Sequence, residues 1–353
     1  MEISFSQHLL QFKYPFKIAL NYRTCTPVVI TEIGCEGLTG YGEASLPPYL
    51  EETVKTVFQF LAKAEKVLKE YNTPENLETI LNRIEAIAQG NTAAKASVDI
   101  ALHDLKGKQE GRPCHTFWNQ NTNKTSAISI STPGKPVITP CISMTLGMDE
   151  PTVLLKKLKE AEAFTILKVK LGGETDFKII ELIRSHTAKA ISVDVNQGWK
   201  TKEDALERIE WLKDKNVLFI EQPLNKLDFS GAAWLKERSP LPIIADESFQ
   251  RISDLNQVKD CFHGINIKLM KCSGMNEAYK IMLQAKLLNL KILIGCMSES
   301  SCAVSAAGQL SPFADWSDLD GPLLIKNDLF SGLNYANGKL VLTDKPGIGV
   351  EKR

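Results

Sequence analysis

Hydrophobic residues follow two different patterns along the chain, and the pattern changes near residue 137. Before that point, short apolar runs bounded by turn residues predict β-strands at Phe16–Ala19, Val28–Ile33 and Leu38–Ala44. Apolar residues at helical spacing then predict helices at Glu51–Tyr71, Pro74–Gln89 and Thr92–Glu110. The polar segment Asn21–Pro27 and the Pro-Pro segment within Ser45–Leu50 predict loops. Residues 1–120 are therefore expected to form an α+β domain.

A strand–helix pattern repeats through residues 137–325. The segment before it, Asn119–Pro136, is rich in Asn, Ser, Thr, Gly and Pro and predicts a linker. Strands are predicted at Cys141–Leu146, Ile166–Leu171, Ala190–Val195, Val217–Glu221, Ile243–Ala245, Gly264–Leu269 and Lys291–Cys296. With an eighth strand ending at Asp318, this order predicts a (β/α) barrel. Residues 326–353 are expected to pack back on the first domain.

The predicted strand within Phe164–Gly173 is apolar but contains two lysines. Lys168 and Lys170 point to one face of such a strand, because side chains alternate across it. An exposed edge strand with a lysine-rich face is the simplest interpretation of this segment alone. In a core strand, each ammonium group would instead make its neighbour easier to deprotonate, so that a lysine could act as a base near neutral pH.

Three carboxylates follow three successive predicted strands. Asp194, Glu221 and Asp246 are each about one βα unit from the next. A single acid at a strand end is usually a helix cap or a surface turn. The C-terminal ends of barrel strands share one rim, however, so these three are expected to be neighbours. Carboxylates that converge on a dry site need a cation between them, and oxygen ligands favour Mg²⁺.

A further lysine is expected on the other side of these carboxylates. Lys170 ends the strand before Asp194, and Lys268 lies in the strand after Asp246. Lys271 lies further along and is interpreted as an exposed turn lysine. A divalent cation between two bases suits removal of the proton α to a carboxylate. One base on each face allows removal from one side and return on the other, which is racemisation or epimerisation.

Composition narrows the possible partners. The 353 residues are 43% hydrophobic and 24% charged, and 42 basic residues balance 42 acidic ones. This composition suits a globular protein and excludes a broad basic surface for nucleic acid. We expect no membrane association and no signal peptide, because apolar runs are short and the N-terminus lacks a basic region. The eight scattered cysteines form no C-x-x-C motif and predict reduced thiols in the cytoplasm.

Taken together, the motifs resemble the enolase superfamily, muconate lactonizing enzyme subgroup, along nearly the whole chain. They are K-V-K at Lys168–Lys170, D-V-N at Asp194–Asn196, E-Q-P at Glu221–Pro223, A-D-E-S at Ala245–Ser248 and N-I-K-L-M-K at Asn266–Lys271. The resemblance implies an α/β protein, a (β/α)7β TIM-like barrel with an α+β capping domain. It also implies a single Mg²⁺ in each subunit, and that Lys170 handles the (R) and Lys268 the (S) configuration.

Within the subgroup, the chain is most similar to the dipeptide epimerases. The similarity is carried by Asp318 and Asp320, because in that family an Asp-x-Asp at the eighth strand binds the α-ammonium group of the substrate. Two carboxylates at i and i+2 of a strand would also suit an ammonium group on physical grounds, although the following Gly-Pro is typical of a turn. The resemblance implies that Lys168 contacts the substrate carboxylate and lowers the pKa of Lys170. Further implied substrate contacts are Thr145, Cys296, Met297 and Ser298.

The implied activity is Mg-dependent epimerisation of the C-terminal residue of an Ala-X dipeptide through an enediolate. The implied setting is a cytoplasmic homo-oligomer in murein peptide metabolism. Glutamate-specific members carry an arginine in the first capping loop, for which Arg23 is the candidate, with Asn21 as the other residue at that place. The identity of X therefore stays open.

Two alternative functions remain. An o-succinylbenzoate synthase or N-succinylamino acid racemase of the same subgroup would use the same lysines and metal, but would leave Asp318 and Asp320 without a purpose. A catalytically inactive barrel kept for ligand binding is disfavoured, because both lysines and all three acids are present.

Overall fold

The computed structural model describes residues 1–18, 21–121, 137 and 139–353. The N-terminal part begins with an antiparallel sheet of β1 (Glu2–Ile18), β2 (Asn21–Cys35) and β3 (Leu38–Ser45), in that order. Most of the predicted linker, together with Ala19 of the first predicted strand, lies outside the described residues.

The loop predicted at Asn21–Pro27 is wrong, because these residues form the first half of β2. Asn21 pairs with Ile18 and Arg23 pairs with Phe16 on β1. Tyr22 is 66% exposed, so this end of the hairpin lies beyond the core. Backbone pairing rather than burial of apolar side chains therefore holds the segment in a strand, and a hydrophobic pattern could not predict it.

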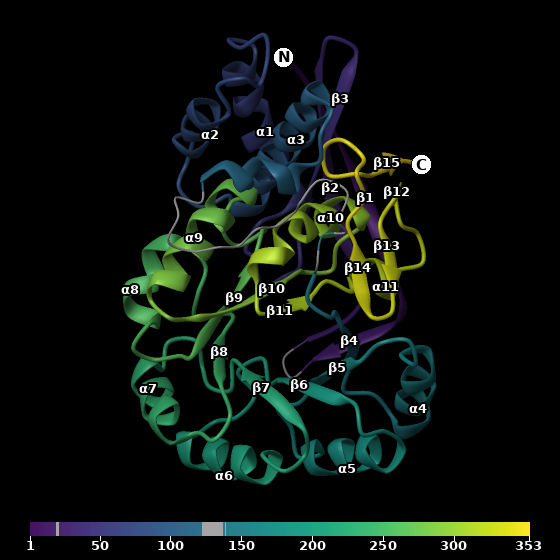
Figure 1. Ribbon diagram of the computed structural model, residues 1–353, viewed down its shortest axis with the longest axis vertical. Coiled ribbons are helices and arrows are strands. Elements are labelled where there is room, and N and C mark those ends of the chain that lie inside the picture. The colour runs from purple at the N-terminus through teal and green to yellow at the C-terminus, as the bar shows by residue number, and fades with distance from the viewer. Residues whose placement is uncertain (19–20, 122–136, 138) are drawn as a thin grey trace.

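Three helices cover the sheet: α1 (Val54–Leu68), α2 (Leu77–Glu85) and α3 (Thr92–Glu110). The helix α3 packs closely on β3, since a Cβ at Gly42 would lie 1.8 Å from the carbonyl oxygen of Ser97. A 3₁₀ helix, η1 (Cys114–Asn121), follows α3. The three-stranded sheet and α1–α3 form what we call the capping domain, at the top of Figure 1.

Eight parallel strands form the second part of the chain, and they confirm the predicted barrel. They are β4 (Ser143–Leu146), β5 (Ile166–Lys170), β6 (Ala190–Asp194), β7 (Val217–Glu221), β8 (Ile243–Ala245), β9 (Gly264–Lys268), β10 (Lys291–Gly295) and β11 (Trp316–Asp318). Each strand pairs with its neighbours in sequence order. Among the described residues, one bridge between Ile142, which directly precedes β4, and Ser317 on β11 joins the two ends of the sheet, so the barrel is nearly closed.

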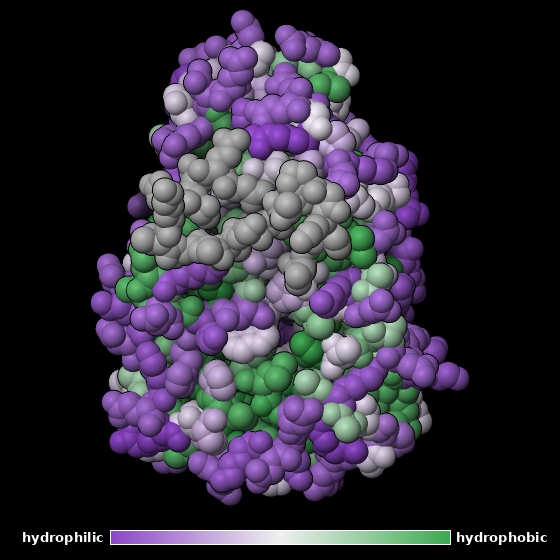
Figure 2. Space-filling view, viewed as in Figure 1, coloured by the Kyte–Doolittle hydropathy of each residue, from purple (hydrophilic) through white to green (hydrophobic). Residues whose placement is uncertain are grey.

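Helices on the outside of the barrel connect the strands, as Figure 1 shows. They are α4 (Pro151–Glu160), α5 (Asp176–His186), α6 (Lys202–Leu212), α7 (Phe229–Arg238), η2 (Ile252–Asp254), α8 (Leu255–Val258), α9 (Met275–Leu287), α10 (Ser301–Leu310) and η3 (Ser311–Phe313). Hydrophilic residues predominate on the outer rim of the barrel in Figure 2, and hydrophobic residues gather nearer its centre. Among the described helices, none has the length and apolar character needed to cross a membrane.

The C-terminal segment contacts the capping domain. It contains α11 (Gly321–Leu324), β12 (Phe330–Ser331), β13 (Asn334–Ala336), β14 (Lys339–Val341) and β15 (Glu351–Lys352). The backbone N–H of Ile348 donates to Asp104 Oδ1 on α3 at 2.9 Å. The segment also contacts the barrel, because Ser305 Oγ on α10 donates to the carbonyl of Ile348 at 2.6 Å. The segment therefore connects the capping domain to the barrel by hydrogen bonds.

Candidate active site

The predicted lysines and carboxylates meet at the C-terminal ends of the barrel strands. Lys170, Asp194 and Glu221 end β5, β6 and β7 and lie opposite one another in the strand register. Asp246 directly follows β8, and Lys268 ends β9. We call Asp194, Glu221 and Asp246 the carboxylate row.

Lys168 and Lys170 point into the barrel, so the interpretation of an exposed edge strand is wrong. Their strand β5 lies between β4 and β6. Lys168 is only 3% exposed and Lys170 only 7%. Leu167 and Val169, which alternate with the lysines, are fully buried on the other face.

Lysines contact the first two members of the carboxylate row. Lys170 Nζ lies 2.5 Å from Asp194 Oδ2. Lys168 Nζ lies 2.9 Å from the same oxygen and 2.8 Å from Glu221 Oε2. It also lies 2.6 Å from Asp318 Oδ2, which joins the row to the last barrel strand. Charge-assisted contacts of this kind compensate the cost of burying each ion.

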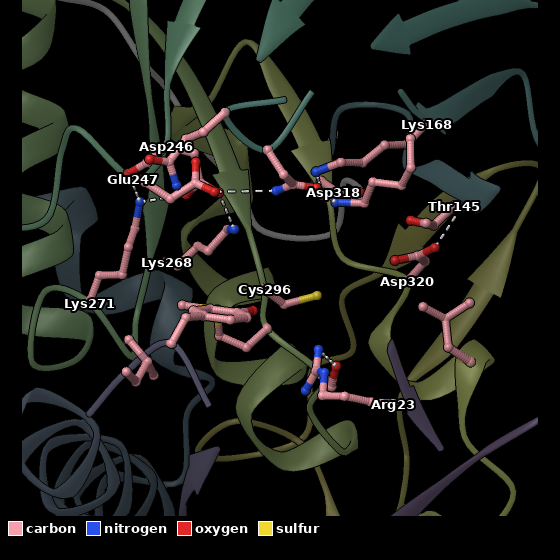
Figure 3. Close-up of a pocket in the computed structure, with 18 of the residues that line it drawn as sticks. Arg23, Thr145, Lys168, Asp246, Glu247, Lys268, Lys271, Cys296, Asp318 and Asp320 are labelled. Atoms are coloured by element: carbon pink, nitrogen blue, oxygen red, sulfur yellow. Dashed lines mark hydrogen bonds and ion pairs between the residues drawn. The ribbon is translucent and has the colours of Figure 1, made fainter. Parts of the chain in front are cut away.

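The far end of the row is held by β9. Lys268 Nζ lies 2.7 Å from Asp246 Oδ2. The side-chain amide of Asn266 donates to Glu221 Oε1 at 2.7 Å. Lys170 and Lys268 thus contact opposite ends of the carboxylate row, as the strand order predicts. Figure 3 shows Lys268 beside Asp246, and Lys168 beside Asp318.

Electrostatics in the site differ from the expectation that neighbouring lysines lower each other's pKa. Burial lowers the pKa of Lys168, but the negative charges of Asp194, Asp318 and Glu221 outweigh it and raise this pKa well above the ordinary lysine value. The pKa of Lys268 is raised in the same way, against burial, by Asp246 and Glu221. The carboxylates therefore dominate over lysine–lysine repulsion.

The pKa values of two acids in the carboxylate row shift in opposite directions. Burial raises the pKa of Asp194, but Lys168 and Lys170 more than offset it and lower this pKa to about 2. Burial, together with the charge of Asp194, raises the pKa of Glu221 to about 7. The lysines are therefore shared unequally along the carboxylate row, with Asp194 better compensated than Glu221.

The residues of the site fit a divalent cation. All three members of the carboxylate row offer oxygen ligands of the kind that Mg²⁺ prefers. Two further buried oxygens, Glu247 Oε2 and Asn266 Oδ1, have no hydrogen-bond donor. Within the described ranges, no three His, Cys, Asp or Glu side chains are already gathered as a metal site. The ammonium groups of Lys168, Lys170 and Lys268 lie against the row instead.

A cavity that is open to solvent lies above these residues. All the residues expected to contact substrate line it, namely Arg23, Thr145, Lys168, Cys296, Met297, Ser298, Asp318 and Asp320. Lys170, Lys268 and Asp246 line it as well. Asp194 and Glu221 are fully buried beneath the lysines. The cavity therefore brings the predicted catalytic and substrate residues together.

Asp318 and Asp320 both line the cavity, but they do not share a strand face. Asp318 ends β11, whereas Asp320 precedes the first turn of α11. Asp318 Oδ1 accepts from Ser143 Oγ at 2.8 Å, and Asp320 Oδ2 accepts from the backbone N–H of Thr145 at 2.7 Å. Gly-Pro after Asp320 starts a helix immediately, which ends the strand alternation.

Two capping-domain segments contribute to the cavity wall, namely the start of β2 and the loop that follows β3. Arg23 donates to Thr26 Oγ1 at 2.6 Å and to Ser298 Oγ at 3.4 Å. Tyr49 lies under the Arg23 guanidinium and donates to Met297 Sδ at 3.3 Å. In Figure 3, Arg23 and Asp246 lie on opposite sides of the cavity. The side chain of Asn21 lies outside the described part of the chain.

Lys271, Glu247 and Tyr49 belong to the site but were not among the predicted site residues. Lys271 is 3% exposed, so its interpretation as an exposed turn lysine is wrong. Glu247 and Tyr49 line the cavity. Glu247 belongs to the A-D-E-S motif, which could have indicated it. Tyr49 follows two prolines in the loop predicted within Ser45–Leu50, a segment that the family resemblance already places over the site.

Comparison with known proteins gives full-length matches. Residues 1–117 match the family described as mandelate racemase / muconate lactonizing enzyme, N-terminal domain, and residues 153–353 match the family described as enolase C-terminal domain-like. An L-Ala-D/L-Glu epimerase of Bacteroides thetaiotaomicron is 48% identical over 353 residues, covering 100% of this chain and 88% of the relative.

Solved structures agree with this match. The substrate-liganded L-Ala-D/L-Glu epimerase of Bacillus subtilis has a TM-score of 0.87 at 27% identity, covering 99% of this chain and 98% of the other. A dipeptide epimerase of Enterococcus faecalis, complexed with Mg and L-Leu-L-Tyr, has a TM-score of 0.87 at 28% identity, with 99% and 98% covered.

Proposed function

This chain belongs to the mandelate racemase / muconate lactonizing enzyme family of the enolase superfamily, and we propose that it is a dipeptide epimerase. It inverts the α-carbon of the C-terminal residue of an Ala-X dipeptide. The main support is that Lys170 and Lys268 contact opposite ends of the carboxylate row. The 48% identity to an L-Ala-D/L-Glu epimerase points to the same reaction.

In this proposal, Asp194, Glu221 and Asp246 hold a single Mg²⁺ in each subunit. The Enterococcus faecalis relative is complexed with Mg. When bound, the cation supplies positive charge for the substrate carboxylate while the α-carbon loses its proton. Lys168 would contact the same substrate carboxylate, and its position against the carboxylate row and Asp318 supports this role.

The two lysines carry the proton transfer. A neutral Lys170 amine accepts the α-proton of the (R) substrate, and the Lys268 ammonium group gives a proton to the opposite face of the same carbon. The (S) substrate uses the two lysines in exchanged roles. Each turnover inverts the carbon and leaves the extra proton on the lysine that acted as base, and both lysines return to their starting states by proton exchange with water. Both lysines line the cavity that is open to solvent, so their protons can exchange with water.

Substrate selection is divided between the barrel and the capping domain. Asp318 and Asp320 bind the α-ammonium group of the dipeptide, because a desolvated cation needs negative partners. Arg23, a cation in the cavity wall supplied by the capping domain, favours an acidic second residue. We therefore propose Ala-Glu as the preferred type of substrate. A cytoplasmic homo-oligomer that acts in murein peptide metabolism remains part of the proposal.

The main alternative is an N-succinylamino acid racemase or o-succinylbenzoate synthase. Such substrates have no free ammonium group, and a succinyl carboxylate would bring negative charge toward Asp318 and Asp320. Burial, together with the charge of Asp318, already raises the pKa of Asp320 to about 7. A further anion beside this pair would be unfavourable, so the site suits an ammonium group better.

A screen of L-Ala-X and D-Ala-X dipeptides in D₂O tests the proposal. Epimerisation there replaces the α-proton of X by deuterium, which mass spectrometry detects as a gain of mass. We expect uptake into Ala-Glu and related dipeptides, and none into N-acetyl-Ala-Glu. Faster uptake into N-succinylamino acids than into any dipeptide would assign the protein to the racemase alternative.

A further inference from the structure

Asp246 stands where the pairing between two barrel strands has already ended. Its strand β8 has only three residues, Ile243–Ala245. The ladder between β8 and β9 consists of Ile244 opposite Gly264 and Ala245 opposite Ile265. The backbone of Asp246 therefore has no ladder partner on β9, although its side chain must be held firmly if it is a metal ligand.

Lys271 provides the missing connection. Its Nζ donates to the carbonyl oxygen of Asp246 at 2.7 Å and to the carbonyl oxygen of Asn266 at 2.9 Å. The ammonium group thus joins the ends of β8 and β9 where their backbone pairing stops. A third bond, at 2.7 Å, goes to Asp246 Oδ1. Asp246 Oδ2 accepts a hydrogen bond from Lys268 instead.

Gln222 holds Asp246 from the other side. Its side-chain Oε1 accepts from the backbone N–H groups of Asp246 and Ser248, both at 3.0 Å. The backbone N–H, the backbone carbonyl and one carboxylate oxygen of Asp246 are therefore all bound by two side chains. Only Oδ2 remains directed toward Lys268 and the carboxylate row.

Because of these contacts, Lys271 is not available for catalytic proton transfer. A lysine ammonium group has three N–H donors, and three acceptors within 2.9 Å take them all. The side chain is 3% exposed, so it is fixed by packing as well as by its bonds. Its contacts serve Asp246 rather than a reacting atom.

We propose that Lys271 is a positioning residue that fixes the carboxylate of Asp246, so that Oδ2 stays available to a divalent cation and to Lys268. This goes beyond a general contribution to folding, because it predicts an effect on one end of the carboxylate row. Loss of Lys271 lets the Asp246 carboxylate rotate. Mg²⁺ binding is then weaker, and proton exchange by Lys268 is slower.

The first test is a Mg²⁺ titration by calorimetry, which does not depend on the proposed function. Lys271→Met removes the ammonium group while keeping most of the side-chain volume. We expect its Kd for Mg²⁺ to rise at least about tenfold. An unchanged or tighter Kd would overturn the proposal, since simple removal of a positive charge beside the site strengthens cation binding.

The matched control is Lys157→Met. Lys157 is also buried, at 7% exposure, and its Nζ lies 2.6 Å from Asp149 Oδ2 on the outer side of the barrel. We expect this variant to lose stability without any change in Mg²⁺ affinity. Equal weakening of Mg²⁺ binding in both variants would show that Lys271 acts only through general stability.

A second variant covers the case in which Lys271→Met does not fold. Lys271→Gln keeps N–H donors near Asp246 but loses the ammonium charge and one of the three bonds. We expect weaker Mg²⁺ binding here as well, by a smaller factor. Wild-type affinity in a folded Lys271→Gln variant contradicts the positioning role.

The second readout rests on the proposed function. In D₂O, Lys271→Met should slow deuterium exchange of the (S) epimer, which Lys268 serves, more than exchange of the (R) epimer. Equal slowing of both epimers would contradict a role at one end of the row. If no dipeptide exchanges even with wild-type protein, the proposed function fails, whereas the Mg²⁺ titration still decides the role of Lys271.

Discussion

Lys168 Nζ lies 2.6 Å from Asp318 Oδ2, so the cation expected to meet the substrate carboxylate is paired with an acid expected to meet the substrate ammonium group. The two charged ends of a dipeptide therefore match two charges that already neutralise each other. A substrate with only one of these ends would leave one partner without compensation. The pair thus favours zwitterionic dipeptides over N-acylated amino acids.

Removing the acids should weaken binding of dipeptides specifically. We expect the double variant Asp318→Asn, Asp320→Asn to raise KM for Ala-Glu by more than about a hundredfold, because each of the two charge-assisted hydrogen bonds contributes about 1.5–3 kcal/mol. Mg²⁺ affinity, measured by calorimetry, should stay nearly unchanged. A KM equal to that of the wild type would show that the ammonium group binds elsewhere.

Arg23 should determine the preference for an acidic second residue. Arg23→Met is expected to lower kcat/KM for Ala-Glu by about tenfold to a hundredfold and to change kcat/KM for Ala-Leu little. Arg83→Met is a suitable control, because Arg83 also lies over a tyrosine ring but is outside the cavity. An equal decrease of kcat/KM for both dipeptides in Arg23→Met would mean that Arg23 supports the cavity wall without contacting the acidic side chain of the substrate.

Metal dependence can be measured as stability as well as activity. Exhaustive chelation should abolish turnover, and added Mg²⁺ should restore it. Mg²⁺ should also raise the melting temperature of the wild type, because a ligand that binds only the folded state stabilises it. We expect both effects to disappear in Asp194→Asn and in Glu221→Gln. Full turnover after chelation is incompatible with the proposed metal site.

Two buried acids between the capping domain and the barrel should make stability depend on pH. Burial raises the pKa of Glu43 to about 7 and that of Glu299 to about 8. Glu43 accepts a hydrogen bond from the backbone N–H of Ser300 at 3.0 Å. In the unfolded chain both acids ionise near the ordinary value of 4.5. Between that value and about 8 the folded state binds more protons, so the free energy of unfolding falls as pH rises.

Denaturant unfolding at a series of pH values checks this expectation. Glu43→Gln and Glu299→Gln should each show a shallower decline with pH than the wild type, because the glutamine cannot ionise. The exposed residue Glu36 provides the control, and Glu36→Gln should decline as the wild type does. A slope in Glu43→Gln equal to that of the wild type would show that Glu43 does not retain its proton in the folded protein.

The sequence allowed prediction of the barrel and of the main site because both depend on periodicity. Parallel strands end at one rim, so polar residues that follow successive strands had to meet. Lys271 could not be predicted this way. It lies beyond a strand end, before turn residues, and only the fold shows that two carbonyls of adjacent strands face it. The strand at Asn21–Pro27 likewise depends on pairing with β1 rather than on its own pattern.

The central claim is that two lysines serve opposite faces of one carbon, and α-proton exchange by single-lysine variants tests it most directly. Lys170→Ala and Lys268→Ala are incubated in D₂O with each epimer of Ala-Glu, and deuterium uptake is followed by mass. We predict that neither variant epimerises, that Lys170→Ala exchanges only the (S) epimer, and that Lys268→Ala exchanges only the (R) epimer. Equal exchange of both epimers by either variant would contradict the account.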